Sequence, residues 1–433
     1  MNKIIAIIFL QFCFSSIGAE LAFTGNSQKV IAIKPEASSG LEQIYVLRGV
    51  AGVTASYTST AGEIVKWYRF GSSGGGNPQE ITDVEHNGTT SSIQNLEGDY
   101  GYIVMEGNRQ YCFWLVDYSK YEFSLNSITF PEEQDCGVAT MVVDSNSEPI
   151  TYYTVSGVPR RLSRDITVAY NTLEWDSDNK SYNTVETENV YENLNGRVVF
   201  TAPLCNTALT VRGDRFLKEW GGEKIITTDT YLTRTVEVQA TATQATRENS
   251  NEVKEESTEL GGSAPAEITF QSYATDAVVY KEWVFASDSE FSNVLLRLND
   301  ETVTYTFKEM GTFYVKFVGS NEDGGCQSES EVFQINIGES KLECPNVFSP
   351  NATEGINDEW KVSYKSIVSF SCWIFDRYGN NIISFTDPAM GWDGKYKGKY
   401  VKSGVYYYVI EASGADGKKY NLKGDINILK SNK

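Results

Sequence analysis

Residues that could carry chemistry are few in this chain. Its one histidine, His86, lies in the polar stretch Glu85-His86-Asn87-Gly88, which ends in a turn dipeptide. Hydrolytic triads of the Ser-His-Asp and Cys-His types need an imidazole base, so a lone turn histidine argues against them. Glu174 and Asp176 could act as a carboxylate pair on glycosides, but with 57 acidic residues chance pairs are expected. We predict no catalytic residues and no enzyme.

Sites for metals and phosphates are also incomplete. Asp176 to Lys180 begins like a calcium loop, but Lys180 takes a ligand position and no glycine follows. Gly71 to Gly76 lack the Gly-Lys-Ser/Thr sequence of a phosphate cradle, which favours a flexible hairpin loop. No two cysteines have CxxC spacing, and zinc lacks histidine ligands. We predict no cofactor and no metal.

Residues 1–19 have the features of a cleaved export signal. Lys3 supplies positive charge, Ile4 to Phe14 form an apolar core, and Ile17-Gly18-Ala19 offers small residues for cleavage. No later apolar run approaches the roughly 20 residues that a membrane-spanning helix needs. We expect a mature chain from residue 20 that has no transmembrane segment and lies outside the inner membrane.

Export permits disulfides among the six cysteines that follow the signal. We predict Cys136 with Cys205 and Cys344 with Cys372, because each pair falls within one predicted domain. Buried thiols without disulfides are the alternative.

The net charge of −20 argues against nucleic acid and anionic membrane surfaces as partners. From Glu339 onward, 13 Lys and Arg face 11 Asp and Glu, a net +2, which leaves −22 on the preceding residues. The C-terminal segment therefore differs electrostatically from the body.

Short alternating runs rich in Tyr, Thr and Val recur between turn residues, as at Gln43 to Arg48, Gln110 to Val116 and Thr312 to Val318. This pattern predicts an all-β fold of tandem immunoglobulin-like β-sandwich domains.

A tryptophan run followed about thirty positions later by a glycine-led aromatic run occurs three times. The pairs are Trp67 to Phe70 with Gly98 to Tyr102, Trp283 to Phe285 with Gly311 to Val315, and Trp373 to Phe375 with Gly404 to Tyr408. We expect each pair to face across two sheets and fill the centre of one sandwich.

The predicted organisation is a signal at 1–19, a sandwich at 20–123, a β-rich domain of unassigned type at 124–236, a sandwich at 237–338 and a last domain at 339–433. Residues 248–264 are polar and small, which indicates an exposed loop or linker.

Residues 237–338 resemble a PKD-type immunoglobulin-like module. The resemblance depends on Ala264-Pro265, Trp283-Val284-Phe285, Tyr305-Thr306-Phe307 and Gly311-Thr312-Phe313-Tyr314-Val315, although the usual Gly-Asp-Gly after the tryptophan strand is absent. Such modules serve as spacers or binding surfaces, and this one implies no catalytic residue.

Residues 339–433 resemble the gliding-motility-associated C-terminal domain, the type B sorting signal of the Bacteroidota type IX secretion system. Two departures are Pro350-Asn351-Ala352-Thr353-Glu354-Gly355, which is one residue longer than usual, and Tyr378 in place of a tryptophan. The motif residues are Pro345, Asn346, Phe348, Pro350, Asn351, Gly355, Asn357, Asp358, Phe375, Arg377, Gly379, Trp392, Asp393, Gly394, Gly404, Tyr406, Tyr408 and Gly424.

The resemblance implies export to the cell surface or medium, with type IX outer-membrane components as partners of this domain. Lys395, Lys397, Lys399 and Lys402 form a basic rim that suits an acidic receptor or anionic lipopolysaccharide, or else are solvated loop charges. We expect a non-enzymatic surface protein with an unidentified ligand. The alternatives are a component of the secretion or attachment machinery and a secreted polysaccharide hydrolase.

Overall fold

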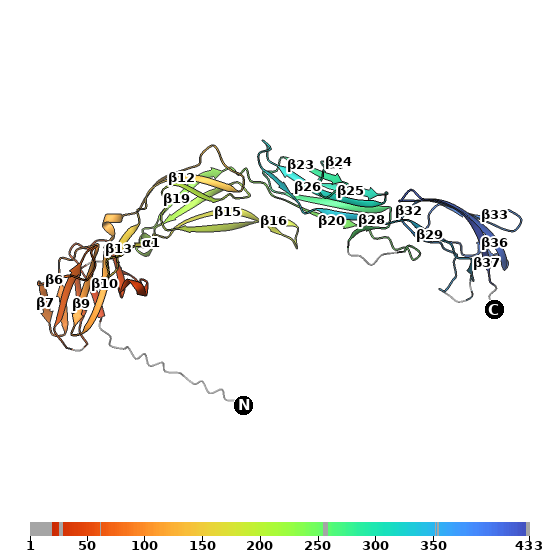
Figure 1. Ribbon diagram of the computed structural model, residues 1–433. Helices are drawn as coiled ribbons and strands as arrows, with labels where there is room; N and C mark the ends of the chain where they lie inside the picture. Colours follow the sequence, from red (N-terminus) through yellow and green to blue (C-terminus); the bar gives the residue numbers. More distant parts are fainter. Residues whose placement is uncertain are drawn as a thin grey trace, which may run out of the picture. The chain divides into compact units, whose positions relative to one another are not determined.

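The computed structural model describes residues 20–25, 29–60, 62–253, 259–350, 352 and 355–429. The predicted export signal and Asn351 lie outside the described residues. Within them the chain is built from strands, with one short helix, α1 (Arg215–Glu219), and two 3-10 turns, η1 (Ala37–Ser39) and η2 (Tyr118–Tyr121) (Figure 1). The predicted all-β class of tandem immunoglobulin-like sandwiches is confirmed.

The strands group into two compact units. The first contains the described residues up to Thr172 together with Thr184–Leu232. The second contains Leu173–Asn183 together with the described residues from Thr233 onward. Each unit is built from sandwiches.

The first sandwich has sheets ordered β1-β4-β8-β7 and β2-β3-β10-β9-β5-β6. Its strands are β1 (Glu20–Thr24), β2 (Ile31–Ile33), β3 (Gln43–Leu47), β4 (Thr54–Thr58), β5 (Val65–Phe70), β6 (Gln79–Ile81), β7 (Val84–Asn87), β8 (Thr90–Ile93), β9 (Tyr100–Glu106) and β10 (Arg109–Asp117). Trp67 is fully buried between the sheets, and its indole N–H donates to Ser91 Oγ at 3.0 Å. Tyr102 stacks on Phe113 in the same core, with ring centroids 5.2 Å apart.

The second sandwich has sheets ordered β11-β12-β17 and β16-β15-β18-β19, and a separate hairpin of β13 and β14. Its strands are β11 (Ser124–Thr129), β12 (Val138–Asn146), β13 (Ile150–Tyr153), β14 (Pro159–Leu162), β15 (Ile166–Asp176), β16 (Ser181–Tyr191), β17 (Gly196–Thr201), β18 (Thr207–Gly213) and β19 (Lys224–Tyr231). This is the segment to which the sequence assigned no type.

One hydrophobic core continues through the first two sandwiches. Trp114 and Tyr118 belong to it from the first sandwich, and Tyr152 and Phe216 from the second. Phe123, the predicted boundary residue, is only 1% exposed within this core. The two sandwiches are therefore packed together and belong to one compact unit.

The glycine-rich stretch Gly71 to Gly76 packs against the turn between β13 and β14. Gly75 N donates to Val155 O at 2.7 Å. A Cβ on Gly74 would lie 2.5 Å from Gly157 N, so only glycine allows this approach. The expectation of a flexible loop is therefore wrong, because the missing side chains permit close backbone packing.

The third sandwich, in the second unit, has sheets ordered β20-β22-β25 and β21-β28-β26-β23-β24, with β27 paired to β26. Its strands are β20 (Val238–Gln244), β21 (Leu260–Gly262), β22 (Ala266–Ala274), β23 (Tyr280–Ala286), β24 (Val294–Leu298), β25 (Thr302–Phe307), β26 (Gly311–Ser320), β27 (Gln327–Glu329) and β28 (Phe333–Ile337). Trp283 is fully buried, and its ring packs on Phe317 at 5.0 Å.

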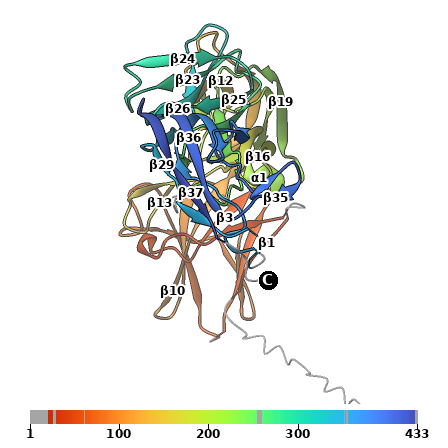
Figure 2. The same cartoon turned by 90° about the vertical axis from the view of Figure 1, so that its right-hand side faces the viewer.

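The fourth sandwich has a five-stranded sheet ordered β30-β37-β36-β32-β33 and two two-stranded sheets, β29-β31 and β34-β35. Its strands are β29 (Lys341–Glu343), β30 (Val347–Phe348), β31 (Ser363–Lys365), β32 (Ile367–Phe375), β33 (Asn381–Phe385), β34 (Lys395–Tyr396), β35 (Lys399–Tyr400), β36 (Gly404–Gly414) and β37 (Lys419–Ile428). β36 and β37 form the final hairpin and run side by side (Figure 2). The hairpin lies inside the sheet, because β30 pairs with β37 on its other side. β37 is thus held by strands on both sides.

The repeated tryptophan runs occupy equivalent places, but the predicted facing arrangement is wrong. In each copy the tryptophan strand and the glycine-led strand are hydrogen-bonded neighbours in one sheet. The cross-strand partners are Trp67 with Val104, Trp283 with Phe317 and Trp373 with Val409. The sequence spacing could not distinguish pairing within a sheet from contact between sheets, because both bring the runs close together.

Residues 248–253 of the predicted linker pack against the fourth sandwich. Val253 N donates to Tyr364 O at 2.8 Å, and Tyr364 N donates to Asn251 O at 3.1 Å. Asn249 Nδ2 donates to the Tyr364 hydroxyl at 2.9 Å. This part of the segment is therefore a fixed contact between the third and fourth sandwiches, and its polar side chains serve hydrogen bonding.

Candidate functional site

The predicted sorting motifs meet in the core of the fourth sandwich. Trp392 is fully buried, and its ring packs against Phe348 at 5.5 Å and Tyr406 at 5.2 Å. The Tyr406 hydroxyl donates to Lys402 O at 3.0 Å, so its polar end is satisfied. Aromatic pairs of this kind add about 0.5–1.5 kcal/mol each to the burial energy. Motifs that are 58 residues apart in sequence thus form one aromatic cluster.

Trp360 forms a second centre that the sequence analysis missed. It is fully buried, its indole N–H donates to Pro345 O at 2.6 Å, and its ring packs on Tyr408 at 5.3 Å. The available signal was a single tryptophan in the polar stretch after Asn357-Asp358. A large apolar side chain among charges is a candidate for burial.

Gly424 is required by the Tyr408 ring. A Cβ at position 424 would lie 2.6 Å from the Tyr408 hydroxyl oxygen, because Tyr408 is the direct cross-strand neighbour of Gly424. The glycine allows the tyrosine ring to cover the backbone of β37. Gly404, at the start of β36, has φ of +148°.

The motif residues in the first part of the fourth sandwich, around Asn346 and Asn357, form hydrogen bonds that fix its loops. Asn346 O accepts from Asn427 N at 2.9 Å, which holds β30 beside β37. Ser349 N donates to Asn357 O at 3.0 Å, and Gly355 N donates to Asp358 Oδ2 at 2.6 Å.

A second close approach joins the motif around Pro350 to the Trp392 loop. Pro350 lies against Gly394, where a Cβ would be 2.8 Å from the proline ring. Asp393 Oδ1 accepts from Lys395 N at 3.0 Å and shapes the turn that follows Trp392. These motif residues therefore build the fold of the domain.

The turn between β32 and β33 places an arginine and a tyrosine in solvent. Arg377 Nη2 donates to the Tyr378 hydroxyl at 2.7 Å, and its guanidinium lies 4.8 Å from the ring centroid. Tyr378 is 74% exposed. Gly379 completes the turn at φ +85°, and its N–H donates to Asp376 O at 3.1 Å.

The prediction that Trp373 fills the core is wrong. Its neighbours Cys372 and Ile374 are fully buried, and side chains alternate along a strand, so Trp373 and Phe375 lie on the outer face. Their cross-strand partners there are Val409 and Tyr407, which are 38% and 47% exposed. The sandwich thus carries a partly exposed aromatic stripe.

The predicted basic rim lies on and beside the β34–β35 hairpin. Lys395 Nζ forms an ion pair with Asp393 at 2.7 Å, which neutralises it. Lys397, Lys399 and Lys402 are exposed, and within the described part of the chain they form no ion pair. Three lysines therefore remain available to a partner of negative charge.

Neither predicted disulfide is formed. Cys136 is disulfide-bonded, but not to Cys205, whose thiol donates to Asn171 O with an Sγ to O distance of 3.6 Å. Cys344 and Cys372 are both thiols, and the Cys372 side chain is enclosed in the core. Burial raises the pKa of Cys372 to about 12 and that of Cys344 above its ordinary value. Shared domain membership was too weak a criterion, since it carries no information on which way a side chain faces.

The side chains considered for catalysis are not assembled into a site. His86 is exposed on β7, the outermost strand of its sheet. Asp176 accepts hydrogen bonds from the Asn179 backbone and side chain, which lower its pKa, the opposite of what a general acid needs. Within the described residues no group of three His, Cys, Asp or Glu side chains is placed to hold a metal. None of the helices in this same part of the chain is long and apolar enough to cross a membrane.

Several solved structures show a weak likeness to this chain. They include the tetra-tandem repeat in the extending region of a large adhesion protein, with 12% identity over 89% of this chain and 98% of that chain, and a TM-score of 0.24. The FN1–FN3 domains of chicken CNTN1 show 11% identity over 71% and 98%, with a TM-score of 0.25. Dimeric latent PorU from Porphyromonas gingivalis shows 10% identity over 75% and 36%, with a TM-score of 0.16. These scores are too low to support a functional argument, and none of the curated proteins matches the chain.

Two family models match parts of the chain. The fibronectin type III domain matches residues 128–228, which is the segment that the sequence analysis left unassigned. The type IX secretion signal domain matches residues 342–428, where the predicted sorting motifs lie. The chain therefore carries a C-terminal domain of the CHU_C type IX secretion signal family, preceded by a fibronectin type III domain of immunoglobulin-like fold.

Proposed function

We propose that this protein is exported through the type IX secretion system to the cell surface or medium, and that it works there by binding or as structure without catalysis. The type IX signal domain at 342–428 supports the route, and the fibronectin type III domain at 128–228 supports a role as a surface protein. In this proposal residues 339–433 act as the sorting and surface-attachment signal.

The convergence of the sorting motifs on one separate core is the observation that carries the proposal. Phe348, Trp392 and Tyr406 share a hydrophobic cluster that is distinct from the clusters of the other sandwiches. A rigid sandwich offers a partner a fixed surface, whereas a frayed terminus would lose conformational entropy on binding. A folded terminal domain is thus suited to recognition by shape.

The partners in this proposal are outer-membrane components of the type IX system. The three available lysines of the basic rim suit an acidic receptor or anionic lipopolysaccharide. The residues before Glu339 carry a net charge of −22, so they would repel either of these negatively charged partners.

A transplant experiment tests the route. Residues 339–433 are fused to a neutral periplasmic passenger in a host with the type IX system, and intact cells are treated with protease. We expect the passenger to become protease-accessible outside the cell. A fusion with Trp392→Ala should remain behind the outer membrane, because this change disrupts the core of the domain. The matched control is the Trp373→Ala fusion, which changes the outer face of the sheet and leaves the core intact. Its export therefore measures what the outer face contributes. Retention of the unmodified fusion would contradict the proposal.

Deletion of residues 339–433 from the whole protein separates cargo from machinery. The proposal expects loss of surface localisation for this protein alone, with other type IX substrates still exported. A general export defect would instead indicate a component of the secretion machinery.

A further inference from the structure

The fibronectin type III domain has two neighbouring edge strands, β16 and β17. Within the described residues β17 is the last strand of the sheet β11-β12-β17, and β16 is the last strand of the sheet β16-β15-β18-β19. The Tyr170 hydroxyl, on β15, donates to Thr201 O of β17 at 2.9 Å and also bonds the Asn189 side chain of β16. This polar connection shows that the edges of β16 and β17 lie on the same side of the sandwich.

The β17 edge lacks the usual features that block strand addition. Its sequence, Gly196 to Thr201, contains one charged residue and no proline, and its register with β12 is continuous without a bulge. Natural edge strands are commonly protected by lysines, prolines or bulges against pairing with another chain. An unprotected edge is therefore a candidate binding site.

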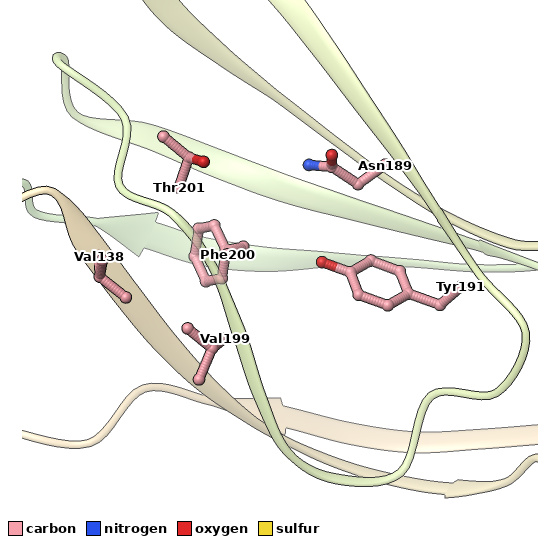
Figure 3. A pocket seen from close by; sticks show the side chains of 6 residues that line it. All are labelled: Val138, Asn189, Tyr191, Val199, Phe200 and Thr201. Carbon is pink, nitrogen blue, oxygen red and sulfur yellow. The ribbon is translucent and has the colours of Figure 1, made fainter.

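A cavity of about 360 Å³ lies between the two edges (Figure 3). Asn189 and Tyr191 project into it from β16, and Phe200 and Thr201 lie opposite on β17 (Figure 3). The remaining lining residues, Val138 and Val199, are 43% and 54% exposed. The lining contains no charged side chain and combines apolar walls with hydroxyl and amide groups.

The residues that adjoin the cavity lining in sequence are acidic. Glu132, Glu133 and Asp135 precede Val138, and Glu192 follows Tyr191, all of them exposed. Residues 128–228 carry nine Lys and Arg against fifteen Asp and Glu. A second copy of this chain, with a net charge of −20, would meet like charge here, whereas a basic segment would be attracted.

We propose that the β17 edge binds an extended segment of another protein by strand addition, with apolar side chains at alternate positions and lysine or arginine residues on either side. Backbone hydrogen bonds to β17 supply affinity, and every second side chain enters the cavity beside Phe200. The basic residues on either side of the bound segment pair with Glu132, Glu133, Asp135 and Glu192. This surface is separate from the sorting domain.

Selection from random displayed peptides of about ten residues tests the proposal with the full-length protein. We expect enriched peptides with alternating apolar residues and flanking Lys or Arg, and protection of the β17 amides from hydrogen exchange on binding. Val199→Lys should weaken binding about tenfold or more. Ile225→Lys, at an equally exposed position (57%) on β19 at the opposite edge of the other sheet, should leave binding unchanged.

Two controls separate strand addition from other contacts. Circular dichroism melts of both variants should match the wild type, since Val199 and Ile225 are more than half exposed. Peptides methylated on the backbone nitrogens that pair with β17 should lose binding, whereas methylation of the alternate nitrogens, which point away from β17, should leave binding unchanged. Selection of no peptides, of peptides without alternation, or of peptides insensitive to Val199→Lys would overturn the proposal. So would Val199-dependent dimerisation of the protein, which would assign the edge to a second copy.

Discussion

Trp360 and Trp392 exchange two backbone hydrogen bonds, each of 2.9 Å, and both side chains are fully buried. Trp360 then contacts Tyr408, and Trp392 contacts Phe348 and Tyr406. This isolated bridge connects two loops whose aromatic contacts lie on β30 and β36. The sorting domain therefore depends on two tryptophans that no regular strand carries.

Replacing Trp392 by Ala should destabilise the fourth sandwich strongly, because the substitution leaves a cavity between Phe348 and Tyr406. The expected loss is about 3–5 kcal/mol. Trp373→Ala removes the same side chain from the outer face and should cost much less. Hydrogen exchange of the β36 and β37 amides measures both, and equal losses for the two variants would contradict the assigned orientations.

The buried ion pair between Arg164 and Asp214 should be sensitive to loss of one partner. Its charged groups are 2.8 Å apart, both side chains are 0% exposed, and the Tyr118 hydroxyl also donates to Asp214 at 3.0 Å. Asp214→Asn leaves the arginine charge without compensation and should cost about 3–5 kcal/mol in the first unit.

The matched control for this prediction is Glu188→Gln, which removes the carboxylate from an exposed pair with Arg212. That change should cost no more than about 1 kcal/mol. Urea titrations followed by hydrogen exchange of β18 compare the two variants. A double variant, Arg164→Met with Asp214→Asn, should recover part of the loss because no buried charge remains.

The thiol of Cys372 should resist alkylation in the folded protein. Burial, together with a smaller contribution from the neighbouring Cys344, raises its pKa to about 12, so the reactive thiolate is scarce at pH 8. We expect labelling by iodoacetamide only at the rate at which the sandwich opens, and full labelling in urea. Mass spectrometry of the peptide that contains Cys372 measures this. Rapid labelling of the folded protein would contradict the burial of this thiol.

Acid should loosen the turn that carries Arg377 and Tyr378. Hydrogen bonds from the Asn380 side chain and backbone lower the pKa of Asp376 below its ordinary value of 3.8. Because the folded pKa is the lower one, the stabilisation is fully present above pH 3.8 and is lost as the pH falls through the folded pKa. Amide exchange at residues 376–380 should accelerate over that window, and the Asp376→Asn variant should lack the transition.

The sequence alone determined the fold class, the C-terminal sorting domain and the final hairpin. Alternation of Tyr, Val and Thr with turn residues is a local property, and so is the dipeptide Asp416-Gly417, where Gly417 adopts φ +77° between β36 and β37. The order of the sorting motifs is likewise a property of the chain. These features needed no knowledge of distant contacts.

The tertiary structure decided which face each residue takes and which strands are neighbours. Trp67 and Trp283 are buried whereas Trp373 faces outward, although all three begin similar runs. A shift of one residue in a strand reverses the face of every side chain, and that register depends on pairing with residues far away in sequence. The same reason explains why the sequence did not reveal the burial of Trp360 or the open edge of β17, and why both disulfide predictions failed. Burial and strand edges exist only once the sheets are assembled.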